Sequence, residues 1–130
     1  MSGFFQEAEM LTEGKRKDIL NGLLETVEGI SDKEYQKRIW ILGEGPECDD
    51  FTETTCHFFE EGDGILEKYT EFGINNRQYE LLVKLWDQFD QFVKGPRSGY
   101  LPEEFIDTPE WAGIMNLARD VVKVFHYPKT

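Results

Sequence analysis

Residue types that commonly carry catalysis are few in this chain. It has two histidines, His57 and His126, and two cysteines, Cys48 and Cys56. It contains no Gly-x-Ser-x-Gly elbow for a nucleophile, no His-Glu-x-x-His zinc motif, no Cys-x-x-Cys pair and no phosphate-binding loop with its lysine. We therefore expect a protein without enzymatic activity, and we assign no catalytic residue.

Cys48, Cys56 and His57 form a cluster of soft metal ligands, but their spacing does not fit a zinc site. Zinc sites typically bring cysteines two to four residues apart, whereas these two cysteines are eight positions apart. Cys56 is expected to pack in the core, with His57 at the surface. The acids from Glu60 to Glu67 lack the Asp-rich loop that holds calcium. We predict no metal and no cofactor.

Carboxylates are the chemically active groups that this chain has in excess. Its 130 residues (15.2 kDa) include 26 Asp and Glu against 14 Lys and Arg, a formal charge of −12. Residues 44–71 hold ten of these acids with Lys68 alone, a net charge of −9. We expect that the protein does not bind nucleic acid, because phosphate contacts need clustered basic residues. The segment is either a solvated face or a docking surface whose field attracts a basic partner.

We predict that eight of these acids form a binding surface for a protein partner. They are Glu44, Glu47, Asp49, Asp50, Glu53, Glu60, Glu61 and Asp63. Trp40 is expected to border them as an interface anchor. It falls one position off the apolar face formed by Tyr35 and Ile39, and tryptophan is common among residues that dominate binding energy.

Helices must position these groups, because apolar residues recur at helical spacing along almost the whole chain. The pattern predicts an all-α protein, one compact domain over residues 1–130 built as a bundle of five or six helices. A first stretch is expected around Phe4 to Leu11. The strongest apolar stripe joins Tyr79, Leu82, Trp86, Phe89 and Val93.

Capping residues, glycines and prolines predict where the helices begin and end. The expected N-terminal caps are Ser31, Asp49 or Asp50, Asn75 or Asn76, and Thr108. Ser31 with Glu34 has the pattern of a capping box, and Gly29 is expected to end the preceding helix. Residues 62–64 (Gly-Asp-Gly) should break or kink a helix, and residues 95–107 should form a loop.

Composition also bounds where the protein acts. Hydrophobic residues make up 39% of the chain and aromatic residues 14%, too many for a disordered protein. No apolar run approaches the length of a membrane span, and the first twenty residues show no apolar core of a secretory signal. We expect a soluble, cytoplasmic protein that does not bind membranes.

The stretch from Arg38 to Phe51, RIWILGEGPECDDF, has a tryptophan, a glycine turn and a run of acids. In these features it resembles small bacterial immunity proteins of contact-dependent inhibition and other polymorphic toxin systems. The resemblance covers residues 38–61, under a fifth of the chain. It implies a cytosolic, non-catalytic protein bound tightly to a toxin domain, often a basic nuclease. Carboxylates of the inhibitor could then occupy the places where phosphates bind.

A second hypothesis belongs to another class of function. Ten phenylalanines in 130 residues would suit a small acidic adaptor or regulatory protein that binds a partner helix through an apolar groove. Such binding would depend weakly on salt. An enzyme would instead require a deep pocket that brings His57 or His126 together with carboxylates.

Overall fold

The computed structural model describes residues 12–44, 50–95 and 101–127, and these are helical without any strand. The elements are α2 (Glu13–Ser31), α3 (Lys33–Tyr35), the π-helix η1 (Gln36–Ile41), α4 (Phe51–Glu67), the 3₁₀-helix η2 (Tyr69–Phe72), α5 (Asn76–Lys94), α6 (Pro102–Phe105) and α7 (Pro109–Val124). The predicted all-α fold is confirmed. The helix expected around Phe4 to Leu11 lies outside the described residues.

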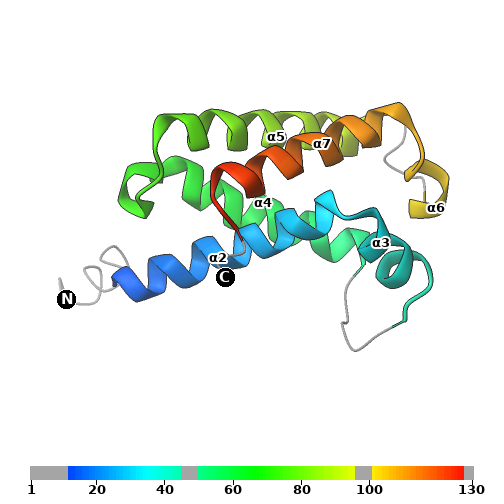
Figure 1. Cartoon of the computed structure of the whole chain (residues 1–130), viewed down its shortest axis with the longest axis horizontal. Helices are drawn as coiled ribbons and strands as arrows, with labels where there is room; N and C mark the ends of the chain where they lie inside the picture. Colours follow the sequence, from blue (N-terminus) through cyan, green and yellow to red (C-terminus); the bar gives the residue numbers. More distant parts are fainter. Residues whose placement is uncertain (1–11, 45–49, 96–100, 128–130) are drawn as a thin grey trace.

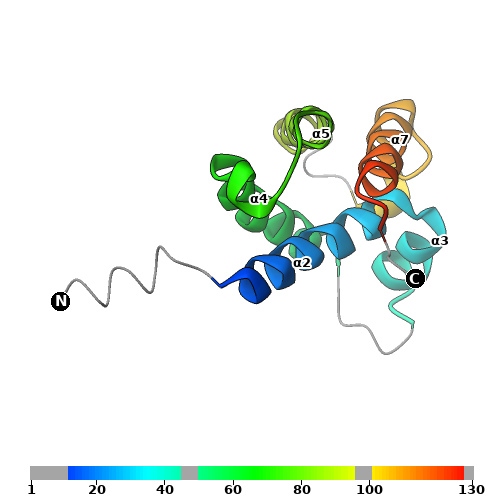
Figure 2. The same ribbon diagram turned by 60° about the vertical axis from the view of Figure 1, so that its left-hand side comes forward.

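Four long helices form a ring around the core (Figures 1 and 2). α2 packs against α4 and α7, and α5 packs against the same two neighbours. The short elements α3, η1 and α6 gather at one end of the bundle, where η1 contacts α6 (Figure 1). None of the helices within the described ranges is both long enough and apolar enough to cross a membrane.

Several predicted helix boundaries are confirmed. Asp50 caps α4, Asn75 caps α5 in a capping box with Gln78, and Thr108 caps α7 with Pro109 in the first turn. α6 is a short helix inside the stretch expected to be a loop. A proline begins it, and the Glu104 side chain accepts a hydrogen bond from the Leu101 backbone N–H at 2.8 Å.

The predicted role of Ser31 as a cap is wrong. α2 does not end at Gly29 but continues to Ser31, because Ile30 is fully buried and extends the apolar stripe of the helix. The Ser31 hydroxyl donates back to the Glu28 carbonyl at 2.7 Å. Asp32 caps α3 instead, since its carboxylate accepts from the backbone N–H groups of Glu34 and Tyr35.

The break predicted at residues 62–64 is also absent, and α4 runs unbroken to Glu67. Gly62 is buried against the Trp86 ring, and a Cβ there would lie 3.5 Å from the ring's Cδ1. The indole N–H of Trp86 donates to the Asp63 carboxylate at 2.9 Å. Glycine in a helix interior costs about 1 kcal/mol relative to alanine, and the contact with α5 offsets that cost.

Trp40 is buried rather than exposed at an interface, so that prediction is wrong. Its side chain is 8% exposed, and its ring makes edge contacts with Trp111 (5.9 Å between centroids) and Phe51 (5.4 Å). Gln36, Ile39 and Trp40 stand at i, i+3 and i+4, a spacing that places side chains on one side of a helix, and all three are buried. The prediction failed because this inward side includes the polar Gln36, which an apolar pattern does not indicate.

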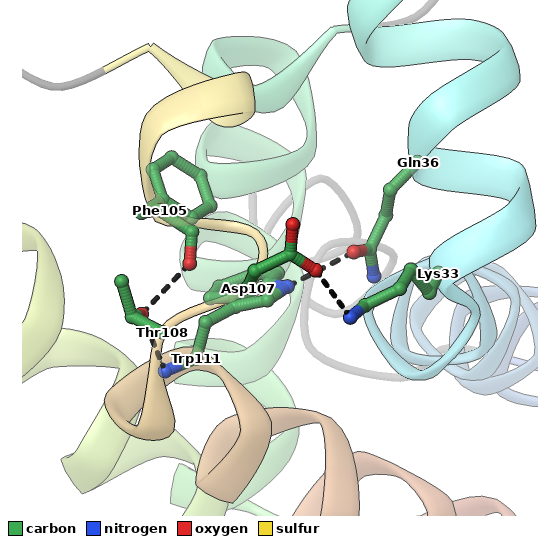
Figure 3. A network of polar contacts seen from close by, with 6 residues as sticks. All are labelled: Lys33, Gln36, Phe105, Asp107, Thr108 and Trp111. Carbon is green, nitrogen blue, oxygen red and sulfur yellow. Dashed lines mark hydrogen bonds and ion pairs between the residues drawn. The ribbon is translucent and has the colours of Figure 1, made fainter.

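Gln36 fastens this end of the bundle (Figure 3). It is fully buried, and its amide N–H groups donate to the carbonyls of Gly29 (3.0 Å) and Ile30 (2.8 Å) at the end of α2. Its oxygen accepts from the indole N–H of Trp111 in α7 at 2.9 Å. One side chain therefore joins η1, α2 and α7. We call Gln36 and Trp111, with the two carbonyls, the amide clasp.

An ion pair lies beside the amide clasp at the surface. The Lys33 ammonium contacts the Asp107 carboxylate at 2.7 Å (Figure 3). This hydrogen bond, and then the charge of the lysine, lower the pKa of Asp107 below its ordinary value. The pair connects α3 with the turn before α7. Its contribution is small, because the Asp107 side chain is 78% exposed.

Candidate functional site

Acidic residues follow one line along the outer side of α4. Asp50 begins the helix, and its carboxylate accepts from the backbone N–H of Glu53 at 2.8 Å. Glu53, Glu60 and Glu67 follow at intervals of seven residues, and all three are exposed. Seven residues are nearly two full turns, so the three side chains drift by only about 20° from one to the next. Thr54, Phe58, Gly62 and Ile65 are buried on the opposite side.

α4 has no internal cation to neutralise this line. The helix contains no lysine and no arginine. Two ion pairs of the described residues, Lys33 with Asp107 and Lys94 with Asp90, lie on other elements. No lysine or arginine of α4 therefore offsets the negative potential that its carboxylates create on the solvent side.

Glu61 lies at the edge of α4 that faces α2. Its Oε2 is so close to α2 that a Cβ on Gly22 would be 2.8 Å away. Burial raises the pKa of the Glu61 carboxyl above its ordinary value. His57 lowers the pKa by a smaller amount, and the charges of Glu25 and Glu60 raise it again. The carboxylates of α2 and α4 therefore act on one another.

Glu25 and Glu28 extend the acidic surface onto α2. Glu25 acts on Glu61 of α4, and the charges of Glu25 and Glu28 both raise the pKa of the Tyr127 phenol, although burial raises it more. A hollow of about 230 Å³ lies beside them, lined also by Gly29, Asp32 and Tyr35. We call the surface of Asp50, Glu53, Glu60, Glu61 and Glu67 on α4, with Glu25 and Glu28 on α2, the acidic face.

The structure thus groups the predicted site residues only in part. Glu53, Glu60 and Glu61 lie on the acidic face with Asp50. Glu44 is exposed but follows η1, where its backbone N–H donates to the Arg38 carbonyl at 2.8 Å. Asp63 is exposed on the side of α4 toward α5, bonded to Trp86. Glu47 and Asp49 lie outside the described residues, and Trp40 is in the core.

Three residues of the acidic face were not predicted from the sequence. Glu67 could have been found, because it continues the seven-residue spacing of Glu53 and Glu60. Glu25 and Glu28 carried no such signal. Their segment, residues 1–43, is close to neutral overall, and nothing in the sequence indicates that α2 lies beside α4.

The soft metal ligands do not build a site. Cys56 is exposed on α4, so its predicted place in the core is wrong, whereas His57 is at the surface as expected. Cys56 is displaced because Thr54 and Phe58 take the inward positions on either side of it. Within the described ranges, no three His, Cys, Asp or Glu side chains come together in an arrangement that could hold a metal ion. Cys48 lies outside those ranges.

Neutralising Glu61 should make the fold more stable at neutral pH. A raised pKa means that the folded state binds the proton of this carboxyl more tightly than the unfolded state does. The protonated carboxyl therefore stabilises the fold at low pH, and this stabilisation is lost as the pH rises through that pKa. Glu61→Gln is expected to raise the midpoint of thermal unfolding at pH 7 by about 1–2 °C, the size of a few tenths of a kcal/mol at a partly exposed site. The difference should vanish in acid. A constant difference across pH would contradict it.

Comparison with known proteins gives no relative from which a role could be transferred. No protein-family model, curated protein or solved structure matches this chain. The acidic face is therefore the feature from which a function is inferred.

Proposed function

We propose that this chain is a non-catalytic immunity protein that binds and neutralises a basic toxin domain of the nuclease type in the cytoplasm. The observation that carries the proposal is the line of carboxylates on α4, in a helix without lysine or arginine and beside further acids of α2. A nuclease surface is basic because it holds phosphates. The acidic face offers carboxylates in place of those phosphates.

The field of the acidic face would act before contact. Most of the charge of −12 lies in residues 44–71, so a basic partner is drawn toward this side of the molecule and associates faster than a neutral one. Once in contact, close charge pairs across such interfaces have coupling energies of about 1.5–7 kcal/mol. Several such pairs would give the tight binding that neutralisation of a toxin requires.

The hollow beside Tyr35 adds a place for one basic side chain. Glu25, Glu28 and Asp32 line it together with the tyrosine. Carboxylates pair with a guanidinium or ammonium group. A lysine or arginine of the partner that enters here would be held by these carboxylates, since the Tyr35 ring already has the Arg38 guanidinium 5.9 Å from its centroid. Glu44, Glu47 and Asp49 stay predicted members of the binding surface.

A binding titration with matched variants tests the proposal. The probe is the toxin domain encoded beside the gene for this chain, in a form inactivated for handling. The triple change Glu53→Gln, Glu60→Gln and Glu67→Gln should weaken binding by about 100-fold or more and flatten its salt dependence, because it removes three charge pairs. The control neutralises three exposed acids elsewhere: Glu80→Gln, Asp87→Gln and Asp120→Gln.

Both triple variants change the net charge equally, so they separate a local surface from the overall charge. The control should bind within about threefold of the unchanged protein and should still protect cells that express the active toxin. Equal losses in both variants would show that only net charge matters. Unchanged binding in the first variant would place the interface elsewhere, and absence of any inhibited toxin would overturn the function itself.

The alternative, an adaptor that binds a partner helix, finds less support in the structure. A groove lined partly by apolar residues does exist beside α2, with a volume of about 390 Å³. Its lining includes four charged side chains (Glu13, Arg16, Lys17 and Glu71), whereas a groove that takes the apolar face of a helix is hydrophobic. The groove therefore suits a small ligand better than a partner helix.

A further inference from the structure

The groove beside α2 is built by three parts of the chain that are distant in sequence. One wall is the first half of α2, and the other is formed by residues 71–78, which run from η2 into the start of α5, and by the residues that follow α7. Along α2 the lining residues recur at helical spacing: Glu13, Arg16, Lys17, Leu20, Asn21 and Leu24. They span eleven helical steps, so the groove follows about 16 Å of this helix.

The chemistry of the groove changes along this length. Its charged residues on α2, from Glu13 to Lys17, come first, and the apolar Leu20 and Leu24 come after them. Phe72 supplies half-buried apolar surface from η2, whereas Leu24 and Phe125 are almost fully buried. A ligand that follows α2 would thus meet charged groups with one end and apolar groups with the other.

The charged end is balanced, in contrast to the chain as a whole. Two cations, Arg16 and Lys17, face the groove together with two carboxylates, Glu13 and Glu71, whereas the full chain has a charge of −12. The fifth titratable group is Tyr127, whose pKa is raised by burial and by nearby carboxylates. It remains a neutral hydrogen-bond donor.

We propose that this groove binds a small amphipathic zwitterion with the chemistry of an apolar α-amino acid. The ligand's carboxylate would pair with Lys17, its ammonium with Glu71 or Glu13, and its side chain would pack on the half-buried Leu20 and Phe72. A volume of about 390 Å³ falls in the range of small-molecule sites. The groove shares no residue with the acidic face, although Tyr127 lies in the field of Glu25 and Glu28, and this proposal does not depend on the proposed toxin interface.

A panel of four ligands tests whether both charges and the apolar body are recognised. The probes are L-phenylalanine, its amine-only analogue phenethylamine, its acid-only analogue hydrocinnamate, and glycine, which lacks the apolar side chain. Backbone amide shifts from NMR report both affinity and place. We expect L-phenylalanine to bind with a dissociation constant of about 1 mM or below and the other three at least about tenfold more weakly. The shifts should centre on Asn21, Gly73 and Tyr127.

Matched variants locate the site without disturbing the core. Asn21→Phe, at an exposed lining position, should fill the groove and weaken binding of L-phenylalanine by about tenfold or more. The same change at exposed Asn116 on α7 should leave it unchanged. Lys17→Gln should weaken binding, whereas Lys84→Gln on α5 should not.

Three results would overturn the proposal. If hydrocinnamate or phenethylamine bound as tightly as L-phenylalanine, the groove would not recognise both charges of a zwitterion. If Asn21→Phe and Asn116→Phe lowered the affinity for L-phenylalanine equally, the groove would not be the binding site. Absence of amide shifts at ligand concentrations several times the expected dissociation constant would remove the site altogether.

Discussion

Replacing Gln36 with leucine is expected to lower the free energy of unfolding by about 3 kcal/mol. Leucine has a similar volume, so the loss comes from polar groups that stay buried without their partners. The indole N–H of Trp111 and the Ile30 carbonyl lose the contacts that Gln36 provides, and the Gly29 carbonyl keeps only a longer one, at 3.3 Å from the Asp32 N–H. Each buried unsatisfied group costs about 1–3 kcal/mol.

Denaturant unfolding measures this loss, with two comparisons that isolate its cause. Gln88→Leu makes the same substitution at an exposed position of α5 and should change stability by less than about 0.5 kcal/mol. The double variant Gln36→Leu with Trp111→Phe removes the orphaned N–H as well. It should therefore cost less than the sum of the two single changes. Strict additivity would mean that the amide clasp does not act as a unit.

Trp111→Ala is expected to have the larger effect, a loss of about 3–5 kcal/mol. Trp111 is fully buried at the centre of an aromatic cluster. Its ring lies between 5.0 and 6.1 Å from the rings of Trp40, Phe51, Phe89, Phe92 and Phe105. Alanine would leave a cavity there and would also open the amide clasp. Such a loss is a large share of the 5–15 kcal/mol typical of a natural domain.

Trp86→Ala provides the comparison for that change. Trp86 is half-buried, and its indole N–H donates to the exposed carboxylate of Asp63. Thermal unfolding should show a loss of about 1–2 kcal/mol, because less surface is uncovered and water can replace the tryptophan at Asp63. Equal losses for the two tryptophans would contradict the central place given to Trp111.

Local sequence signals predicted the helices well where the capping residue decided the boundary. Asn75 and Thr108 begin their helices as predicted, because their side chains satisfy backbone N–H groups that no other residue can reach. Residues 62–64 misled the prediction because a glycine in a helix can be stabilised by a contact from elsewhere. That contact is the Trp86 ring, which lies 24 residues further along the chain.

The place of Trp40 could not be predicted from the apolar pattern alone. Trp40 shares its side of the helix with the polar Gln36, and Gln36 is buried because it finds hydrogen-bond partners in α2 and α7. The candidate site was predictable to the extent that it lies within α4. Its extension to Glu25 depends on the packing of α2 against α4, which is a tertiary contact.

The packing of α2 against α7 has a consequence for how the protein is made. Translation produces α2 first, yet α7, one of the two long helices that cover it, follows almost eighty residues later. Until then Leu23, Val27 and Ile30 lack part of the shelter that the finished bundle gives them. Contacts between such distant segments form late and slow folding. A chain whose synthesis ends before Pro109 would thus leave this apolar stripe open to aggregation or to a chaperone.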